Sequence, residues 1–110
     1  MPTYNKLVRD RIPKIIEASE KAYTTRILSE EEYIDALQTK CLEEFEEYRK
    51  AESNQEAMEE LADLLEVMNA LCKVHGASLK EVDDLRKAKA ARRGGFEERI
   101  FLMEVEDDES

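Results

Sequence analysis

Three copies of the spacing Ser-x-x-Glu divide most of this chain into helical segments. They begin at Ser29, Ser53 and Ser78. In this spacing the Ser hydroxyl and the Glu carboxylate satisfy backbone amides that the first turn of a helix leaves unpaired. Glycine follows the second segment at Gly76 and ends the third at 94–95, as is typical of helix C-termini. The predicted helices are therefore 29–50, 54–75 and 78–93.

The remaining segments predict shorter elements. A short helix is expected from about Asp10, with Pro13 in its first turn, where a missing amide costs little. Segments 23–28 and 99–105 are rich in aromatic and β-branched residues, which favours two short strands that pair and join the chain ends. The acidic end, residues 104–110, is expected to be frayed. The predicted fold is thus mainly α, an antiparallel helical hairpin plus flanking helices and a short β element, in one domain of residues 1–110.

Charge and hydropathy limit the classes of partner. The 27 acidic and 17 basic residues give a net charge of −10, which repels nucleic-acid phosphates and argues against a general duplex binder. No apolar run reaches the roughly 18 residues of a membrane span, and residues 1–10 lack the apolar run of a secretion signal. We expect a cytoplasmic protein that does not bind membranes. Its core is expected to be small, so a second copy or a metal would add stability.

Four acidic side chains are placed unusually for solvated residues. On a helical wheel of about 100° per residue, Glu44 lies about 60° from the centre of the first long helix's apolar stripe, and Glu47 follows one turn later. On the next helix Glu60 falls inside the apolar arc and Asp63 lies at its edge. Burial of such carboxylates without a cation is unfavourable. The acids that the wheel instead directs to solvent are Glu43, Glu46, Glu59 and Glu66.

The two unusual pairs are in register with each other. In an antiparallel hairpin, Glu44 lies level with Asp63 and Glu47 with Glu60, because both pairs have the same sum of residue numbers and imply a turn beside Ser53. Four converging carboxylates cannot all stay ionised unless cations neutralise them. Oxygen ligands alone favour Mg²⁺, with Mn²⁺ as a substitute. The alternative is that these charges only form solvated helix faces, as most charge runs do.

The same residues resemble a known family. Glu44-x-x-Glu47 followed by Glu60-x-x-Asp63 resembles the all-α nucleoside triphosphate pyrophosphohydrolases of the MazG-like superfamily. The opening block 4–13, YNKLVRDRIP, and the block 93–100, RGGFEERI, are similar to the two ends of its phosphoribosyl-ATP pyrophosphohydrolase-like subgroup. The resemblance implies a helical fold that assembles as dimers or larger, with the acids holding Mg²⁺ against a nucleotide's phosphates. It also implies hydrolysis of a nucleoside triphosphate to a monophosphate and pyrophosphate.

Cleavage of a phosphoanhydride bond needs both metal ions and cationic side chains. Metal ions activate water and neutralise the phosphates. The expected metal ligands are Glu44, Glu47, Glu60 and Asp63, and Glu47 is also the candidate general base. We expect basic residues of the opening block and of the third long helix to bind the negatively charged substrate. The candidate substrate-binding residues are Lys6, Arg9, Lys89, Arg93, Gly94, Gly95 and Phe96, and Phe96 is equally compatible with a core position.

The leading functional hypothesis is Mg²⁺-dependent hydrolysis of a small-molecule nucleoside triphosphate by a homo-oligomer, a dimer or tetramer. House-cleaning of modified or surplus nucleotides is favoured over the histidine pathway, because the dedicated enzyme of that pathway lacks the Asn-Lys-Leu-Val-Arg-Asp opening. One alternative is hydrolysis of phosphoribosyl-ATP or another pyrophosphate-containing metabolite at the same site. Another alternative is a non-catalytic, acidic helical module that serves oligomerisation.

Overall fold

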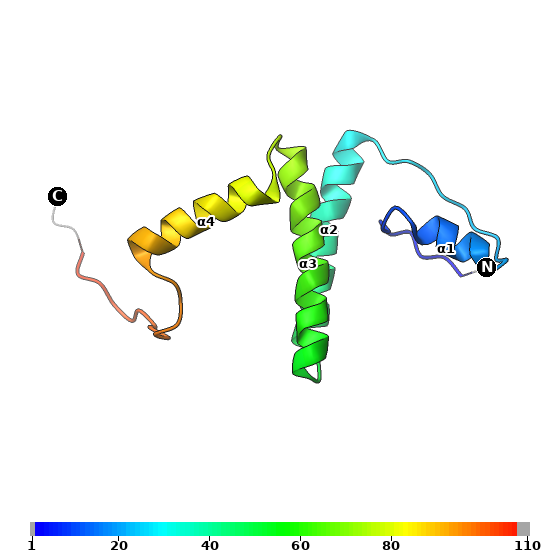
Figure 1. Ribbon diagram of the computed structural model, residues 1–110. Helices are drawn as coiled ribbons and strands as arrows, with labels where there is room; N and C mark the ends of the chain where they lie inside the picture. Colours follow the sequence, from blue (N-terminus) through cyan, green and yellow to red (C-terminus); the bar gives the residue numbers. More distant parts are fainter. Residues whose placement is uncertain (1, 108–110) are drawn as a thin grey trace. The chain divides into compact units, whose positions relative to one another are not determined.

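The computed structural model describes residues 2–107. Within this range the chain forms four helices (Figure 1). They are α1, Ile12–Ala18; α2, Glu30–Arg49; α3, Asn54–Val74; and α4, Leu79–Arg93. The mainly α prediction is confirmed, and the three long helices begin and end within one residue of their predicted limits.

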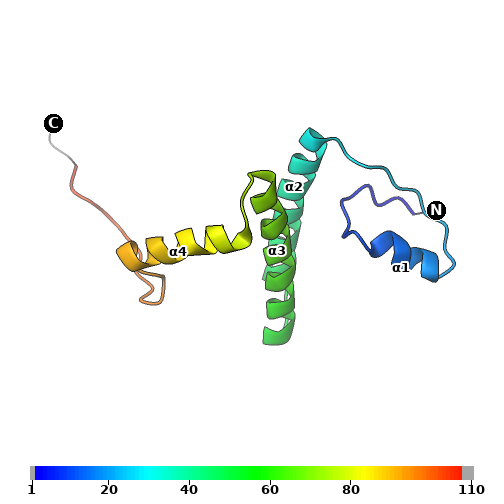
Figure 2. The same cartoon turned by 45° about the horizontal axis from the view of Figure 1, so that its top comes forward.

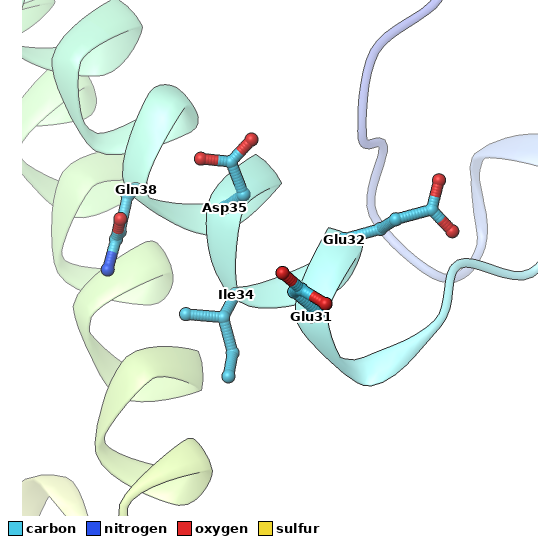
Figure 3. Close-up of a pocket in the computed structure, with 5 residues that line it drawn as sticks. All are labelled: Glu31, Glu32, Ile34, Asp35 and Gln38. Carbon is cyan, nitrogen blue, oxygen red and sulfur yellow. The ribbon is translucent and has the colours of Figure 1, made fainter.

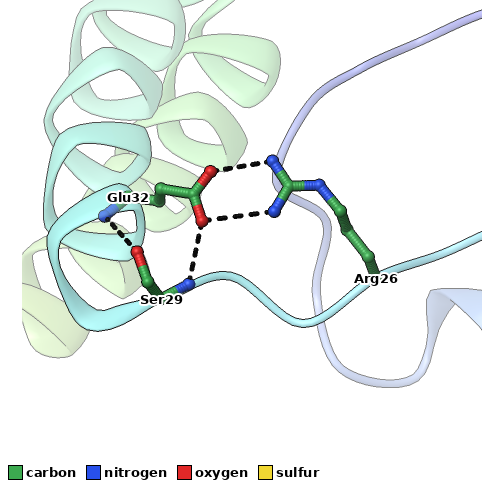
Figure 4. Close-up of polar contacts among 3 residues, drawn as sticks. All are labelled: Arg26, Ser29 and Glu32. Atoms are coloured by element: carbon green, nitrogen blue, oxygen red, sulfur yellow. Dashed lines mark hydrogen bonds and ion pairs between the residues drawn. The ribbon is translucent and has the colours of Figure 1, made fainter.

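The start of α2 shows why the boundaries are predictable (Figure 4). The Ser29 hydroxyl accepts a hydrogen bond from the Glu32 amide at 3.2 Å, and the Glu32 carboxylate accepts one from the Ser29 amide at 3.1 Å. The Arg26 guanidinium donates to both Glu32 carboxylate oxygens, at 3.2 and 2.8 Å. These hydrogen bonds, that of Arg26 first, lower the pKa of Glu32 to about 2.

The beginning of α3 uses the same chemistry in a looser form. The Ser53 hydroxyl accepts a hydrogen bond from the Glu56 amide at 3.1 Å. The Glu56 carboxylate accepts from the amide of Glu52, one residue before the cap, at 3.0 Å. The Ser53 oxygen satisfies an amide of the first helical turn, and the Glu56 carboxylate holds the residue before the cap, so α3 begins at Asn54 as predicted.

Helices α2 and α3 pack side by side as an antiparallel hairpin (Figures 1 and 2). The buried apolar side chains of the described chain are Leu37 from α2 and Val67 and Cys72 from α3. At the end of α3, Gly76 adopts a φ of +72°, a left-handed conformation that costs glycine little and that stops the helix. This hairpin is the predicted one, and it fixes which faces of the two helices meet.

The chain divides between Leu79 and Lys80 into two compact units. The first contains α1 and the α2–α3 hairpin, and the second contains nearly all of α4 and the segment that follows it. Within α4, ion pairs one turn apart join Lys80 to Asp84 and both Arg86 and Lys87 to Asp83. The helix ends before Gly94, whose φ is +83°.

The predicted β element is wrong. In residues 2–107 neither 23–28 nor 99–105 forms a strand, and no backbone hydrogen bond joins the two segments. Arg99 has a φ of +57°, a left-handed conformation that is incompatible with a strand beginning there. The Arg26 side chain, in the first of these segments, donates hydrogen bonds to the Glu32 carboxylate in the first turn of α2. Aromatic and β-branched composition alone therefore did not supply the backbone partner that a strand requires.

Residues 104–107 are exposed and form neither helix nor strand, and the rest of the predicted frayed tail, 108–110, lies outside the described residues. Within residues 2–107 no helix is long and apolar enough to cross a bilayer.

Candidate active site

Three carboxylates from the two hairpin helices converge on one point. Glu44 on α2 and Glu60 and Asp63 on α3 each offer an oxygen atom, and these three atoms lie within 4.8 Å of one another. All three residues are half-buried. The geometry follows from the hairpin, because Glu60 and Asp63 lie one turn apart on α3 and face the part of α2 that carries Glu44.

The other acids of the motif lie differently. Glu43, Glu46, Glu59 and Glu66 are exposed, on the sides of the helices that the wheel directs to solvent. Glu47, predicted as a metal ligand and as the general base, is also exposed and is not among the three converging residues. Its negative charge nevertheless helps to raise the pKa of Glu60, so Glu47 lies near that acid.

The negative charges of the cluster affect the ionisation of Glu60. Partial burial raises the pKa of Glu60, and the negative charges of Asp63, Glu44, Glu47 and Glu59 raise it further. Within residues 2–107 Glu60 forms no ion pair with lysine or arginine. A divalent cation would oppose this rise in pKa, because it stabilises the ionised form of all three acids.

Two cations lie beside the other two acids. Nη2 of Arg9, a predicted phosphate-binding residue, lies 2.7 Å from Oδ1 of Asp63. Nζ of Lys40 lies 3.6 Å from Oε1 of Glu44, and both of these side chains are largely buried, at 19% and 16% exposed. Lys40 was not predicted as part of the site. Its position one helical turn before Glu44 is the sequence signal that would have found it.

The donor set fits a hard divalent cation. It consists of carboxylate oxygens from two rigid helices, with neither thiolate nor imidazole among the three converging residues. Oxygen ligands of this kind suit Mg²⁺ or Mn²⁺ and disfavour softer metals. The identity of the metal itself stays a prediction.

The predicted substrate-binding residues divide between the two units. In the first, the Lys6 ammonium lies 5.8 Å from the centre of the Tyr4 ring, and Arg9 contacts Asp63. In the second, the exposed residues Lys89 and Arg93 occupy the last turns of α4. A Cβ at Gly94 or Gly95 would meet no atom within 4 Å, so this backbone is open to approach. Phe96 is 97% exposed and does not form part of a core in the described chain.

An open hollow lies elsewhere on α2, near its beginning (Figure 3). Its lining residues are Glu31, Glu32, Ile34, Asp35 and Gln38. No lysine or arginine lines it, so it lacks the positive charge that a phosphate group needs. The three carboxylates, rather than this hollow, are the chemical centre that the structure offers.

Comparisons with known proteins identify the family of the chain. An uncharacterised protein of Mycolicibacterium smegmatis is 46% identical over 54 residues, which are 49% of this chain and 55% of the relative. The chain thus matches only about half the length of that relative. No solved structure matches. A family model described as phosphoribosyl-ATP pyrophosphohydrolase matches residues 1–89, which include the opening block and both acidic pairs. This match confirms the resemblance seen in the sequence, and the chain belongs to the phosphoribosyl-ATP pyrophosphohydrolase family.

Proposed function

We propose that this protein is a Mg²⁺-dependent pyrophosphohydrolase that cleaves a phosphoanhydride bond of a nucleotide and releases pyrophosphate. The observation that carries the proposal is the convergence of Glu44, Glu60 and Asp63 within 4.8 Å across the hairpin. Membership of a family described as pyrophosphohydrolases supports the reaction class.

The three converging carboxylates would hold the cation. When bound, a divalent cation neutralises phosphate oxygens and lowers the pKa of a water molecule that it binds. Mn²⁺ would bind the same oxygen ligands and serve as a substitute.

The chain's own side chains would assist the transfer of water to phosphorus. Glu47 is exposed beside the cluster, so its carboxylate is free to take the proton of the attacking water. As the new P–O bond forms, the bond to the leaving pyrophosphate breaks and negative charge develops on the leaving group. Arg9 and Lys6 are the cations of the first unit that would bind this charge. Contact with the substrate by Lys89, Arg93, Gly94, Gly95 and Phe96 remains a prediction from the sequence.

The family description makes phosphoribosyl-ATP the first substrate to test. Ordinary and modified nucleoside triphosphates share its triphosphate group. They are the second class of substrate to test, because the opening block 4–13 suggested a house-cleaning role. Both substrate classes present the same phosphates to the metal and cations, so the nucleoside part must decide between them.

The α3 surface supports assembly of two or more copies. Four large apolar residues on α3 remain exposed and recur at helical spacing, so they share one face. They are Met58, Leu61, Leu65 and Met68. Exposed apolar patches of this kind usually mark interaction surfaces, and a homo-oligomer would cover this one.

The experiment is pyrophosphate and orthophosphate release from phosphoribosyl-ATP and a panel of ordinary and damaged nucleoside triphosphates, with and without Mg²⁺. Asp63→Asn removes one converging carboxylate, and Glu66→Gln is the matched control on the solvent side of α3. We expect Mg²⁺-dependent pyrophosphate release that Asp63→Asn abolishes and Glu66→Gln retains. Silence across the whole panel, or equal loss in both variants, would contradict the proposal.

A further inference from the structure

Arg9 and Asp63 contact each other, although the proposed reaction gives them different partners. Asp63 belongs to the three converging carboxylates, whereas Arg9 is a candidate for binding phosphate. In the structure the Arg9 guanidinium instead donates a hydrogen bond to Oδ1 of Asp63, at 2.7 Å. The donor on Nη2 is thus held by the acid rather than available to a phosphate.

The contact is close but accessible to solvent. The side chains of Arg9 and Asp63 are 56% and 44% exposed. Exposed ion pairs contribute little to stability, because water and salt screen the charges. The Lys40–Glu44 pair is much less exposed, so of the two cations Arg9 is the one that can leave its acid readily.

A divalent cation at the three carboxylates would act against the contact in two ways. It would take electron density from Oδ1 of Asp63, which now accepts from Arg9, and it would repel the positive guanidinium nearby. Release of Arg9 would leave a guanidinium with free N–H donors beside the metal, where the phosphates of a substrate would lie.

We propose that Arg9 is an exchangeable counterion of Asp63, which divalent metal displaces and which then binds a phosphate of the nucleotide. Metal binding thereby prepares the nucleotide site, and the two ligands bind with positive coupling. Without metal, Arg9 stays on Asp63, where it partly neutralises the acid and keeps its Nη2 donor away from a phosphate. The inference rests on the proposed function, because it takes the three carboxylates to be the metal site.

The test measures binding by calorimetry on the full chain at low ionic strength. Mn²⁺ is titrated alone, and α,β-methylene-ATP is then titrated in the presence of saturating Mn²⁺. Two variants of Arg9 are compared. Arg9→Gln removes the positive charge, and Arg9→Lys retains it. Arg11→Gln is the matched control, since Arg11 lies in the same segment and forms no ion pair within residues 2–107.

We expect opposite effects of Arg9→Gln on the two ligands. Loss of the competing cation should tighten Mn²⁺ binding by about two- to fivefold, the range expected for an exposed ion pair. Loss of the phosphate contact should weaken nucleotide binding by about tenfold or more. Arg9→Lys should restore part of both effects, and Arg11→Gln should change neither.

The outcomes separate the inference from the proposed function. If the wild-type chain binds Mn²⁺ and hydrolyses nucleotide, but Arg9→Gln binds Mn²⁺ equally or more weakly, the inference is overturned and the proposed function stands. If tighter metal binding occurs without weaker nucleotide binding, the transfer of Arg9 to phosphate is likewise overturned. If the wild-type chain binds no divalent metal, both proposals fail.

Discussion

At the scale of single residues, the three converging acids differ in their neighbours. Asp63 has Arg9 at 2.7 Å and Glu44 has Lys40 at 3.6 Å, whereas Glu60 forms no ion pair within residues 2–107. Its pKa is raised by partial burial and by four neighbouring acids. Glu60 is therefore the acid whose charge is least compensated when no metal is bound.

Removal of the Glu60 charge should have opposite effects on the stability of the metal-free protein and on its activity. Glu60→Gln should raise the free energy of unfolding of the metal-free protein at neutral pH. It should also lower turnover by more than about 100-fold, because even residues behind metal ligands cost about 10- to 100-fold. Chemical denaturation with a chelator present and an assay with Mg²⁺ measure the two effects. Glu66→Gln, the solvent-side control, should change neither.

The sign of the pH effect follows from the raised pKa of Glu60. The folded metal-free chain binds this proton more tightly than the unfolded chain does, so stability falls as pH rises from near 4.5 through the raised value. Glu60→Gln should remove this part of the slope. A metal-free variant that keeps the wild-type slope would show that another group causes it.

The effect of Glu32 on the pH dependence of stability should be opposite to that of Glu60. Its pKa is about 2 in the folded chain against 4.5 ordinarily, mainly through the hydrogen bond from Arg26. The stability that this depressed pKa provides is complete above pH 4.5 and is lost as pH falls toward 2. Denaturation between pH 7 and 2 should therefore show a shallower acid loss for Glu32→Gln than for wild type. Glu31→Gln, an exposed neighbour, should keep the wild-type profile.

At the scale of elements, the helix starts are set locally. The Ser53 hydroxyl caps α3, the helix that carries Glu60 and Asp63, through a 3.1 Å hydrogen bond from the Glu56 amide. Ser53→Ala should lower the free energy of unfolding by about 0.5–2 kcal/mol, whereas Ser53→Gly should cost only a few tenths. Urea denaturation measures the difference. Equal losses in the two variants would mean that the cap does not stabilise α3.

The same locality explains which elements could be predicted from the sequence. Ser29, Ser53 and Gly76 decide helix ends through groups within a few residues, so the pattern is readable without the fold. A strand depends on a partner elsewhere in the chain, and segments 23–28 and 99–105 have none within residues 2–107. The β prediction failed for this reason.

At the scale of the whole molecule, the exposed face of α3 predicts assembly. Leu65 and Met68 are 47% and 41% exposed although they lie on the helix that holds most of the core. We expect the wild-type chain to sediment as a dimer or larger. The double substitution Leu65→Gln and Met68→Gln should shift it toward monomer with little loss of helix content. Ile27→Gln, at an exposed position outside this face, should leave the assembly unchanged.

A wild-type chain that sediments as a monomer at all concentrations would contradict this prediction. It would leave the exposed apolar face of α3 uncovered, because among the described apolar residues only Leu37, Val67 and Cys72 are buried in the isolated chain. Such a small core is unusual for a chain of this length.

The sequence by itself determined the helices, the hairpin register and the placement of Glu44, Glu60 and Asp63 along the inner faces. These features depend on spacing along one helix or on two helices joined by a short turn, where residue number fixes position. Only the tertiary structure decided that Glu47 lies outside the converging group and that Arg9 accompanies Asp63. The Arg9 contact spans 54 residues, and no local pattern encodes a contact between groups so far apart in the chain.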